Sequence, residues 1–203
     1  MHVILYEPRL LFYHAARCSF ESLGCKVTSI TSSKLVEEFY KPYAEGVLFA
    51  IGVSGAGEDI SSLLRAIYRL NMLNAKLVVW IPARDELLVR VMYGLGVQNL
   101  LCEAYIQEEL PKRILNQNFS SQHLPRYYQP RGKGQCKTKL SCRELDILID
   151  CSHGLNSYEI ARSRHTSYKT VFTHKRNARN RLNLENSIQW LDLLTRLQQL
   201  RTF

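Results

Sequence analysis

The stretch from Ser167 to Leu182 carries the side chains of this sequence that are best suited to bind a polyanion. Ser167 is a predicted N-cap, and the helix that follows it turns about 100° per residue. One side of that helix is apolar and consists of Val171, Ala178 and Leu182. The opposite side is polar, has no carboxylate, and consists of Lys169, Thr173, Arg176 and Asn180. Such a helix fits the major groove of DNA, although an ordinary solvated face explains the segment when it is taken alone.

The distribution of charge favours a polyanion-binding module. Residues 131–203 hold 14 Lys and Arg and 6 Asp and Glu, a net charge of +8 out of +9 for the whole chain. Residues 1–115 hold 12 side chains of each sign. A merely soluble basic surface explains the sign of the charge but not its confinement to one part of the chain.

The segments around Ser167 supply the helices that would position it. Ser141 and Glu144 form a predicted capping box at the start of a helix that ends at Gly154. A second short helix is expected at Tyr158–Ser163, and a tight turn leads from it to Ser167. Two helices joined in this way make a helix-turn-helix. A fourth helix, capped by Asn186 or Ser187, has an apolar stripe that consists of Ile188, Leu191, Leu194 and Leu197.

Residues 1–115 alternate between apolar, strand-like runs and amphipathic, helix-like runs. The expected strands are His2–Tyr6, Cys25–Ile30, Gly46–Val53, Lys76–Ile81 and Asn99–Cys102. The expected helices are Leu10–Leu23, Ser33–Tyr40, Ile60–Leu73, Leu87–Leu95 and Gln107–Asn116. This order predicts an α/β domain, a doubly wound parallel sheet with helices on both faces. No glycine-rich phosphate-binding motif follows the first strand, so no motif supports nucleotide binding.

Residues 116–137 have no apolar period and are rich in Pro, Gly, Ser and Gln, which is typical of a linker. We therefore expect three parts: an α/β domain at 1–115, a linker at 116–137 and an all-α, four-helix domain at 138–203.

The first part resembles the receiver domain of bacterial response regulators in the order and length of its elements. That family phosphorylates an aspartate at the end of its third strand, in an acidic pocket that binds magnesium. The matching positions in this sequence are Glu7, Ala50, Ile81 and Glu103. Ala50 has no nucleophilic atom, Ile81 has no hydroxyl group, and Glu103 stands where the family has a lysine. The resemblance therefore implies a degenerate pseudo-receiver that is not phosphorylated by the family mechanism.

The segment from Leu140 to Leu191 resembles, without gaps, the DNA-binding domain of the LuxR/NarL/FixJ family. The family motif T-x-R-E corresponds to Ser141–Glu144, G-x-x-x-x-E-I-A to Gly154–Ala161, and S-x-x-T-V-x-x-H to Ser167–His174. The run KTVFTHKRNA is most similar to the enterobacterial branch of capsule and fimbrial regulators, which includes RcsB-, RcsA- and EcpR-like proteins. The resemblance implies a bacterial transcription regulator, not an enzyme, that binds double-stranded DNA. The partner within a dimer would be a second copy or another LuxR-type regulator, and RNA polymerase is a further candidate partner.

The resemblance and the helical pattern together assign candidate residues. We expect Lys169, Thr173 and Arg176 to contact bases or the groove, and we expect a second set to lie nearer the phosphates: Tyr168, Thr170, Lys175 and Arg179. The apolar stripe of the fourth helix is the expected dimer surface. His174 is expected to be a packed, hydrogen-bonded histidine rather than a ligand or a catalytic base.

Three residues depart from the family pattern, because Arg164, Thr166 and Lys175 occupy positions that are usually apolar. An unpaired charge is costly to bury, so we expect these side chains to reach solvent or DNA. Arg164 and Thr166 would weaken the isolated helix-turn-helix, which favours the main alternative, an auxiliary subunit that acts by pairing with another LuxR-type regulator.

Other classes of protein find no support in the sequence. No run of about 18 apolar residues is present, and Glu7 and Pro8 interrupt the apolar start, so neither a membrane span nor a signal peptide is expected. We therefore expect a cytoplasmic protein. The six cysteines form no CxxC pair, and Cys136, Cys142, Cys151 and His153 match no common zinc spacing. We expect neither a metal nor a cofactor.

Overall fold

The computed structural model describes residues 1–32, 46–54, 60–82, 85–116 and 139–200. Its first part contains a five-stranded parallel sheet with the strand order β2-β1-β3-β4-β5. The strands are β1 (His2–Tyr6), β2 (Lys26–Ile30), β3 (Val47–Gly52), β4 (Lys76–Ile81) and β5 (Asn99–Cys102). All five expected strands are present, and their bounds differ from the expected ones by at most one residue, which confirms the α/β fold.

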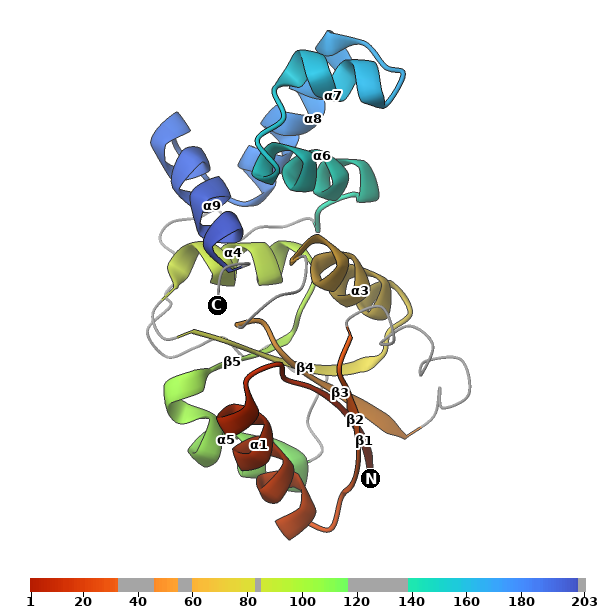
Figure 1. Ribbon diagram of the computed structural model, residues 1–203, viewed down its shortest axis with the longest axis vertical. Helices are drawn as coiled ribbons and strands as arrows, with labels where there is room; N and C mark the ends of the chain where they lie inside the picture. Colours follow the sequence, from red (N-terminus) through yellow and green to blue (C-terminus); the bar gives the residue numbers. More distant parts are fainter. Residues whose placement is uncertain (33–45, 55–59, 83–84, 117–138, 201–203) are drawn as a thin grey trace.

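Helices cover both faces of this sheet (Figure 1). The elements are α1 (Leu10–Ser22), α3 (Ile60–Met72), α4 (Glu86–Gly94), the 3-10 helix η2 (Glu103–Tyr105) and α5 (Ile106–Asn116). Helices α1 and α5 lie on one face, and α3 and α4 lie on the other. Strands buried on both faces require apolar side chains throughout, which explains the uninterrupted apolar runs. The helix expected at Ser33–Tyr40 lies outside the described residues.

Four helices form the second part: α6 (Cys142–Ser152), α7 (Ser157–Ser163), α8 (Tyr168–Arg181) and α9 (Ser187–Gln199). Their starts follow from local capping. The Ser141–Glu144 capping box is present, the Ser167 hydroxyl accepts from the Thr170 N–H at 3.0 Å, and Asn186 rather than Ser187 caps α9. Gly154, with φ of 86°, follows α6 in a conformation that favours glycine.

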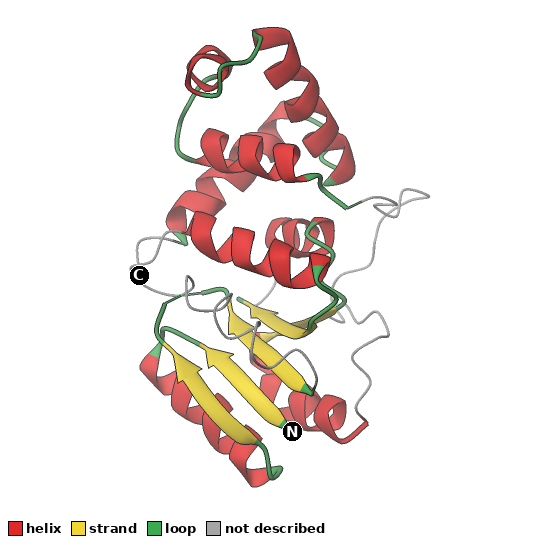
Figure 2. Ribbon diagram, turned by 90° about the vertical axis from the view of Figure 1, so that its right-hand side faces the viewer, coloured by secondary structure: helices red, strands yellow, loops and turns green. Residues whose placement is uncertain are grey.

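The helical part packs on the α3 and α4 side of the sheet (Figure 2). One continuous apolar core runs from that side of the sheet into the four C-terminal helices. The Leu140 N–H donates to the carbonyl of Gly94, at the end of α4, at 2.8 Å. The expected linker, 116–137, lies outside the described residues except for Asn116, the last residue of α5. In the described part of the chain, no helix has both the length and the apolar character needed to cross a membrane.

Candidate nucleic-acid interface

Helix α8 presents its polar side to solvent, as the sequence predicts. Val171 and Ala178 are completely buried, whereas Lys169, Thr173, Arg176 and Asn180 are exposed. The Thr173 hydroxyl donates to the carbonyl of Lys169 at 2.9 Å, and its oxygen remains able to accept a hydrogen bond. No acidic side chain occurs within the helix. The exposed side can therefore supply cations and hydrogen-bond donors to a polyanion.

The residues expected near phosphates lie in different environments. Tyr168 and Thr170, in the first turn of α8, are exposed, and the Thr170 hydroxyl lies 2.8 Å from that of Ser167. Arg179 is half-buried, and its Nε has no hydrogen-bond partner within the described part of the chain. His174 is also half-buried, but the expected hydrogen bond is not seen at its Nδ1, which is buried without a partner among the described residues.

Lys175 differs from the expectation. Its side chain is half-buried, and its Nζ lies 5.7 Å from the centre of the Trp190 ring on α9. Lys175 is only about 40° from Val171 around the helix axis, so it belongs beside the core stripe rather than on the outward side. An indole ring attracts a cation placed over its face, which allows the charge to remain at this position.

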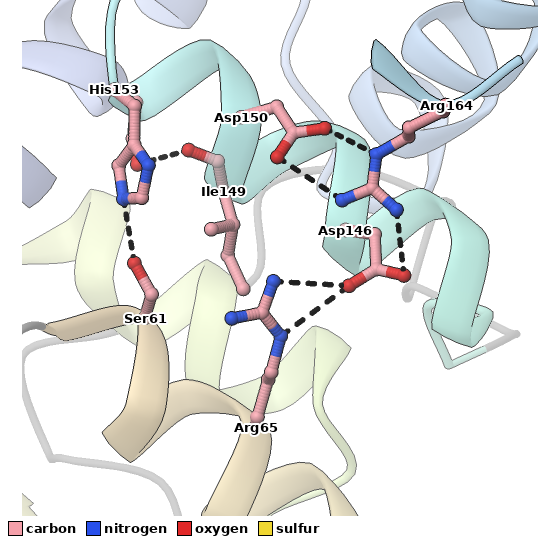
Figure 3. Close-up of polar contacts among 8 residues, drawn as sticks. Ser61, Arg65, Asp146, Ile149, Asp150, His153 and Arg164 are labelled. Carbon is pink, nitrogen blue, oxygen red and sulfur yellow. Dashed lines mark hydrogen bonds and ion pairs between the residues drawn. The ribbon is translucent and has the colours of Figure 1, made fainter. Parts of the chain in front are cut away.

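Arg164 also finds protein partners rather than reaching for solvent or DNA (Figure 3). Its Nε pairs with Asp150 on α6, and its Nη1 lies 3.2 Å from Asp146. The hydrogen bonds with Asp150 raise the pKa of Arg164 despite its partial burial. Asp146 also binds Arg65 of α3 at 3.2 Å, so the ion-pair network extends into the α/β part. The charge at Arg164 is therefore compensated by carboxylates of the same chain.

Three aromatic side chains on the helix-turn-helix form a surface feature that is not evident as a unit from the sequence. Tyr158 of α7 and Tyr168 and Phe172 of α8 are 71%, 42% and 53% exposed. Ring centres are 4.4 Å apart for Tyr158–Tyr168 and 6.4 Å apart for Tyr168–Phe172. The i, i+4 spacing of Tyr168 and Phe172 signals one shared helix face, but only the fold brings Tyr158 beside them.

The apolar stripe of α9 is divided between surface and core. Ile188 and Leu191 are 68% and 60% exposed, and Leu194 is partly buried. Leu197 is completely buried, so the expectation that it forms a dimer surface is wrong. The reason is that the C-terminal half of α9 packs in the shared core, next to α4, whereas its first turns project beyond that contact.

A second polar cluster lies at the carboxyl ends of the strands in the α/β part. Glu7 is buried and accepts hydrogen bonds from Arg9 Nε at 2.9 Å, Arg9 Nη2 at 2.9 Å and Trp80 Nε1 at 2.8 Å. Arg9 Nη1 also donates to Glu103 at 3.0 Å, and Ser54 donates to the same carboxylate at 2.7 Å. Burial acts against the charge of Arg9, but the hydrogen bonds with Glu7 and Glu103 outweigh it and raise the pKa of Arg9.

The structure shifts two positions that the receiver resemblance assigned to this cluster. Ala50 and Ile81 are completely buried within β3 and β4, on opposite faces of the sheet. Gly52 is the β3 residue next to Glu7, because a Cβ there would lie 2.2 Å from Glu7 Oε2 and 2.8 Å from Trp80 Nε1. Trp80 is the β4 residue that reaches the cluster. The resemblance located the ends of β3 and β4 correctly, but not the residue of each strand that faces the cluster. Gly52 is the signal for that residue in β3, because a glycine within a strand often marks the close approach of another group.

Comparisons with known proteins agree with both parts of the architecture. Residues 138–194 match the family model of bacterial regulatory proteins, luxR family. The chain is similar to RcsB of Salmonella enterica serovar Typhimurium bound to a promoter in the presence of the phosphomimetic BeF3−, with 20% identity, a TM-score of 0.55 and coverage of 96% of this chain and 97% of that one. It is also similar to an RcsB–DNA complex, with 20% identity, a TM-score of 0.53 and coverage of 96% and 98%. At these identities the likeness shows the fold. Comparison with curated proteins finds no match.

Proposed function

We propose that this chain, whose residues 138–194 form a LuxR-family helix-turn-helix domain, is a DNA-binding regulator of transcription. The observation that carries the proposal is the exposed side of α8, where Lys169, Thr173 and Arg176 stand together without an acidic neighbour in the helix. An exposed cationic helix that follows a tight turn fits the major groove as a recognition helix.

The proposed contacts divide by position on α8. Lys169, Thr173 and Arg176 contact base edges or the groove, and Arg176 is suited to a guanine edge through two hydrogen bonds. Tyr168, Thr170 and Arg179 lie nearer the phosphates. Lys175 is no longer assigned to DNA, because its ammonium group lies over Trp190.

The proposed regulator acts without phosphorylation of its α/β domain. Neither Ala50 nor Gly52 has a side-chain oxygen, and the guanidinium of Arg9 takes the place between Glu7 and Glu103 where a cation would otherwise be needed. The chain itself therefore places one positive charge between the two carboxylates. We further propose a division into the α/β domain at 1–115, the linker at 116–137 and the DNA-binding domain at 138–203.

The proposed dimer forms through the exposed start of α9, at Ile188 and Leu191, with a second copy or with another LuxR-type regulator. The auxiliary-subunit alternative has lost one of its supports, since Arg164 is paired with Asp150 and Asp146. Its other support, Thr166, is exposed, so that side chain reaches solvent as expected.

Selection from a random duplex library with the full-length chain tests this function, followed by titration of the enriched duplex at several salt concentrations. We expect one enriched sequence and an affinity that falls steeply with salt, because phosphate contacts release counterions. Lys112→Ala is the control for loss of a positive charge outside α8, and it should bind the enriched duplex as the unmodified chain does. Lys112 is an exposed lysine of α5 that pairs with Glu108 on the same helix. Salt-independent binding or the absence of any enriched duplex would refute the function. Enrichment only in the presence of a second regulator would support the auxiliary subunit.

A further inference from the structure

Tyr158, Tyr168 and Phe172 form an exposed row of three rings, here called the aromatic strip. It runs from the first turn of α7, across the turn of the helix-turn-helix, to the second turn of α8. The planes of neighbouring rings differ by only 22° and 26°, so each ring is stacked on the next. Large exposed aromatic groups arranged side by side are more than the isolated apolar residues that every surface has.

Mutual packing prepares the aromatic strip for a partner. Stacked rings hold one another in a fixed orientation, so little conformational freedom is lost when a ligand covers them. The strip lies at the end of the molecule farthest from the sheet, because α7 and the turn after it are remote from the α/β part (Figure 1). A large partner can therefore reach it without separating the two parts of the chain.

The neighbours of the aromatic strip identify the class of partner. Phe172 is about 40° from Arg176 around the axis of α8 and one turn away from it, so its ring borders the cationic side. The nearest carboxylate in sequence, that of Glu159, is engaged in the capping box of α7 through the Asn156 N–H at 2.7 Å. The aromatic strip thus runs along a face that is cationic and rich in hydrogen-bond donors. A partner that fits both features has a surface that is anionic and also carries apolar groups.

We propose that Phe172, supported by Tyr168, contacts the 5-methyl groups of thymines in the major groove, and that the protein therefore selects sites with a thymine at that position. This inference rests on the proposed function. Thymine is the only base of unmodified DNA that presents a methyl group in the major groove, and phenylalanine is suited to an apolar contact with it. Tyr158 belongs to the first helix of the motif, which crosses the DNA backbone, so it lies toward the sugar–phosphate edge.

This mode of reading has a distinctive energetic signature. Loss of one buried methyl contact lowers affinity about fourfold. The contact involves no charge and releases no counterion, so its removal leaves the dependence of affinity on salt unchanged. Arg176 differs in the salt dependence, since loss of its charge alters that dependence as well as the preference for a base.

Replacement of thymine by deoxyuridine tests the inference, because it removes the methyl group and leaves the hydrogen-bonding edge intact. The probe is the duplex enriched from the random library, with each thymine replaced in turn. We expect one or two of these replacements to weaken binding of the unmodified full-length chain about fourfold. The same replacements should not change binding of Phe172→Ala. Binding of Phe172→Tyr should remain sensitive to them. Leu115→Ala, which removes a 70% exposed leucine from α5, is the control for loss of an exposed apolar group.

Each outcome has a defined meaning. Deoxyuridine sensitivity that disappears in Phe172→Ala, with an unchanged salt slope, supports the inference. Specific binding that ignores every methyl group, or equal sensitivity in the wild type and in Phe172→Ala, overturns it and leaves the proposed function intact. A Phe172→Ala variant that binds all duplexes normally but no longer pairs with a protein assigns the aromatic strip to a protein partner and also overturns it. Absence of any DNA binding refutes the proposed function itself.

Discussion

Arg9 holds the buried carboxylate of Glu7 through two side-chain hydrogen bonds of 2.9 Å, from Nε and from Nη2. The two residues are separated in sequence by Pro8 alone, so the pair is formed where β1 ends and before α1 begins. A buried carboxylate needs a nearby positive charge and several hydrogen-bond donors. Arg9 supplies both, and it joins Glu7 to Glu103. The cation between these two carboxylates is thus a side chain of the α/β domain itself.

Replacement of Arg9 by alanine should destabilise the protein strongly. It would leave the carboxylate of Glu7 buried with only Trp80 as a side-chain donor, and removal of one partner of a buried pair costs about 3–5 kcal/mol. Arg17→Ala is the control, because Arg17 forms an exposed i, i+4 pair with Glu21, and it should cost at most about 0.5 kcal/mol. Urea unfolding of both variants measures the difference. Equal stabilities would show that the pair with Glu7 is unimportant.

Small phosphodonors with magnesium should leave no acid-labile phosphate on residues 1–115. The reason is that Gly52 and Ala50 carry no acceptor oxygen, and the guanidinium of Arg9 already lies between Glu7 and Glu103. Intact-protein mass spectrometry after treatment checks this, and magnesium alone should leave the thermal midpoint unchanged. Stoichiometric aspartyl phosphate in this part of the chain would restore a role in signal relay.

Asp85 should contribute to stability in two separable ways. Its side chain caps α4 by accepting from the Leu88 N–H at 3.0 Å, and it pairs with Arg196 of α9 at 2.5 Å. Asp85→Asn keeps an N-cap and weakens only the pair, so we expect a loss of about 0.5–1 kcal/mol. Asp85→Ala removes both, and a loss of about 1–2 kcal/mol is expected. Denaturant midpoints of the two variants would contradict this account if they coincided.

The two ends of the α9 stripe should respond differently to substitution. Leu191→Ser removes an exposed apolar group and should weaken dimerisation with little change in the stability of the monomer. Leu197→Ala opens a cavity in the shared core and should cost about 2–5 kcal/mol. Sedimentation equilibrium and urea unfolding separate these effects. A dimer that withstands Leu191→Ser would place its interface elsewhere.

Arg176 and Lys175, adjacent in sequence, should have different roles. Arg176→Ala should cost about 1–3 kcal/mol on the enriched duplex and relax the preference at one base pair. Lys175→Ala removes the cation over Trp190 and should lower folding stability by about 0.5–1 kcal/mol with a nearly unchanged salt slope of DNA binding. Binding titrations and unfolding curves for both variants decide this. If Arg176→Ala lowered the affinity for all duplexes equally, Arg176 would not be a residue that reads a base.

Local patterns in the sequence predicted the elements of this protein well. Ser141, Asn156 and Ser167 begin helices because their side chains bond to N–H groups within three residues, an interaction that needs no tertiary contact. The apolar runs of the central strands β3 and β4 predicted a sheet covered on both faces, since only such a sheet buries nearly every side chain of these strands, whereas the edge strand β2 is mostly exposed or half-buried. The outward side of α8 followed from helical periodicity alone.

The tertiary structure decided which side chains meet across the chain. Arg164 is neutralised by Asp150 and Asp146, which are 14 and 18 residues earlier and come within reach only because α6 and α7 pack together. Gly52 rather than Ala50 lies next to Glu7, because Tyr6 pairs with Ile51 in the parallel register of β1 and β3. Leu197 is buried because α9 packs beside α4, although the periodicity of α9 is the same at its exposed and its buried end. Periodicity identifies the apolar face of a helix, and only the fold determines what covers it.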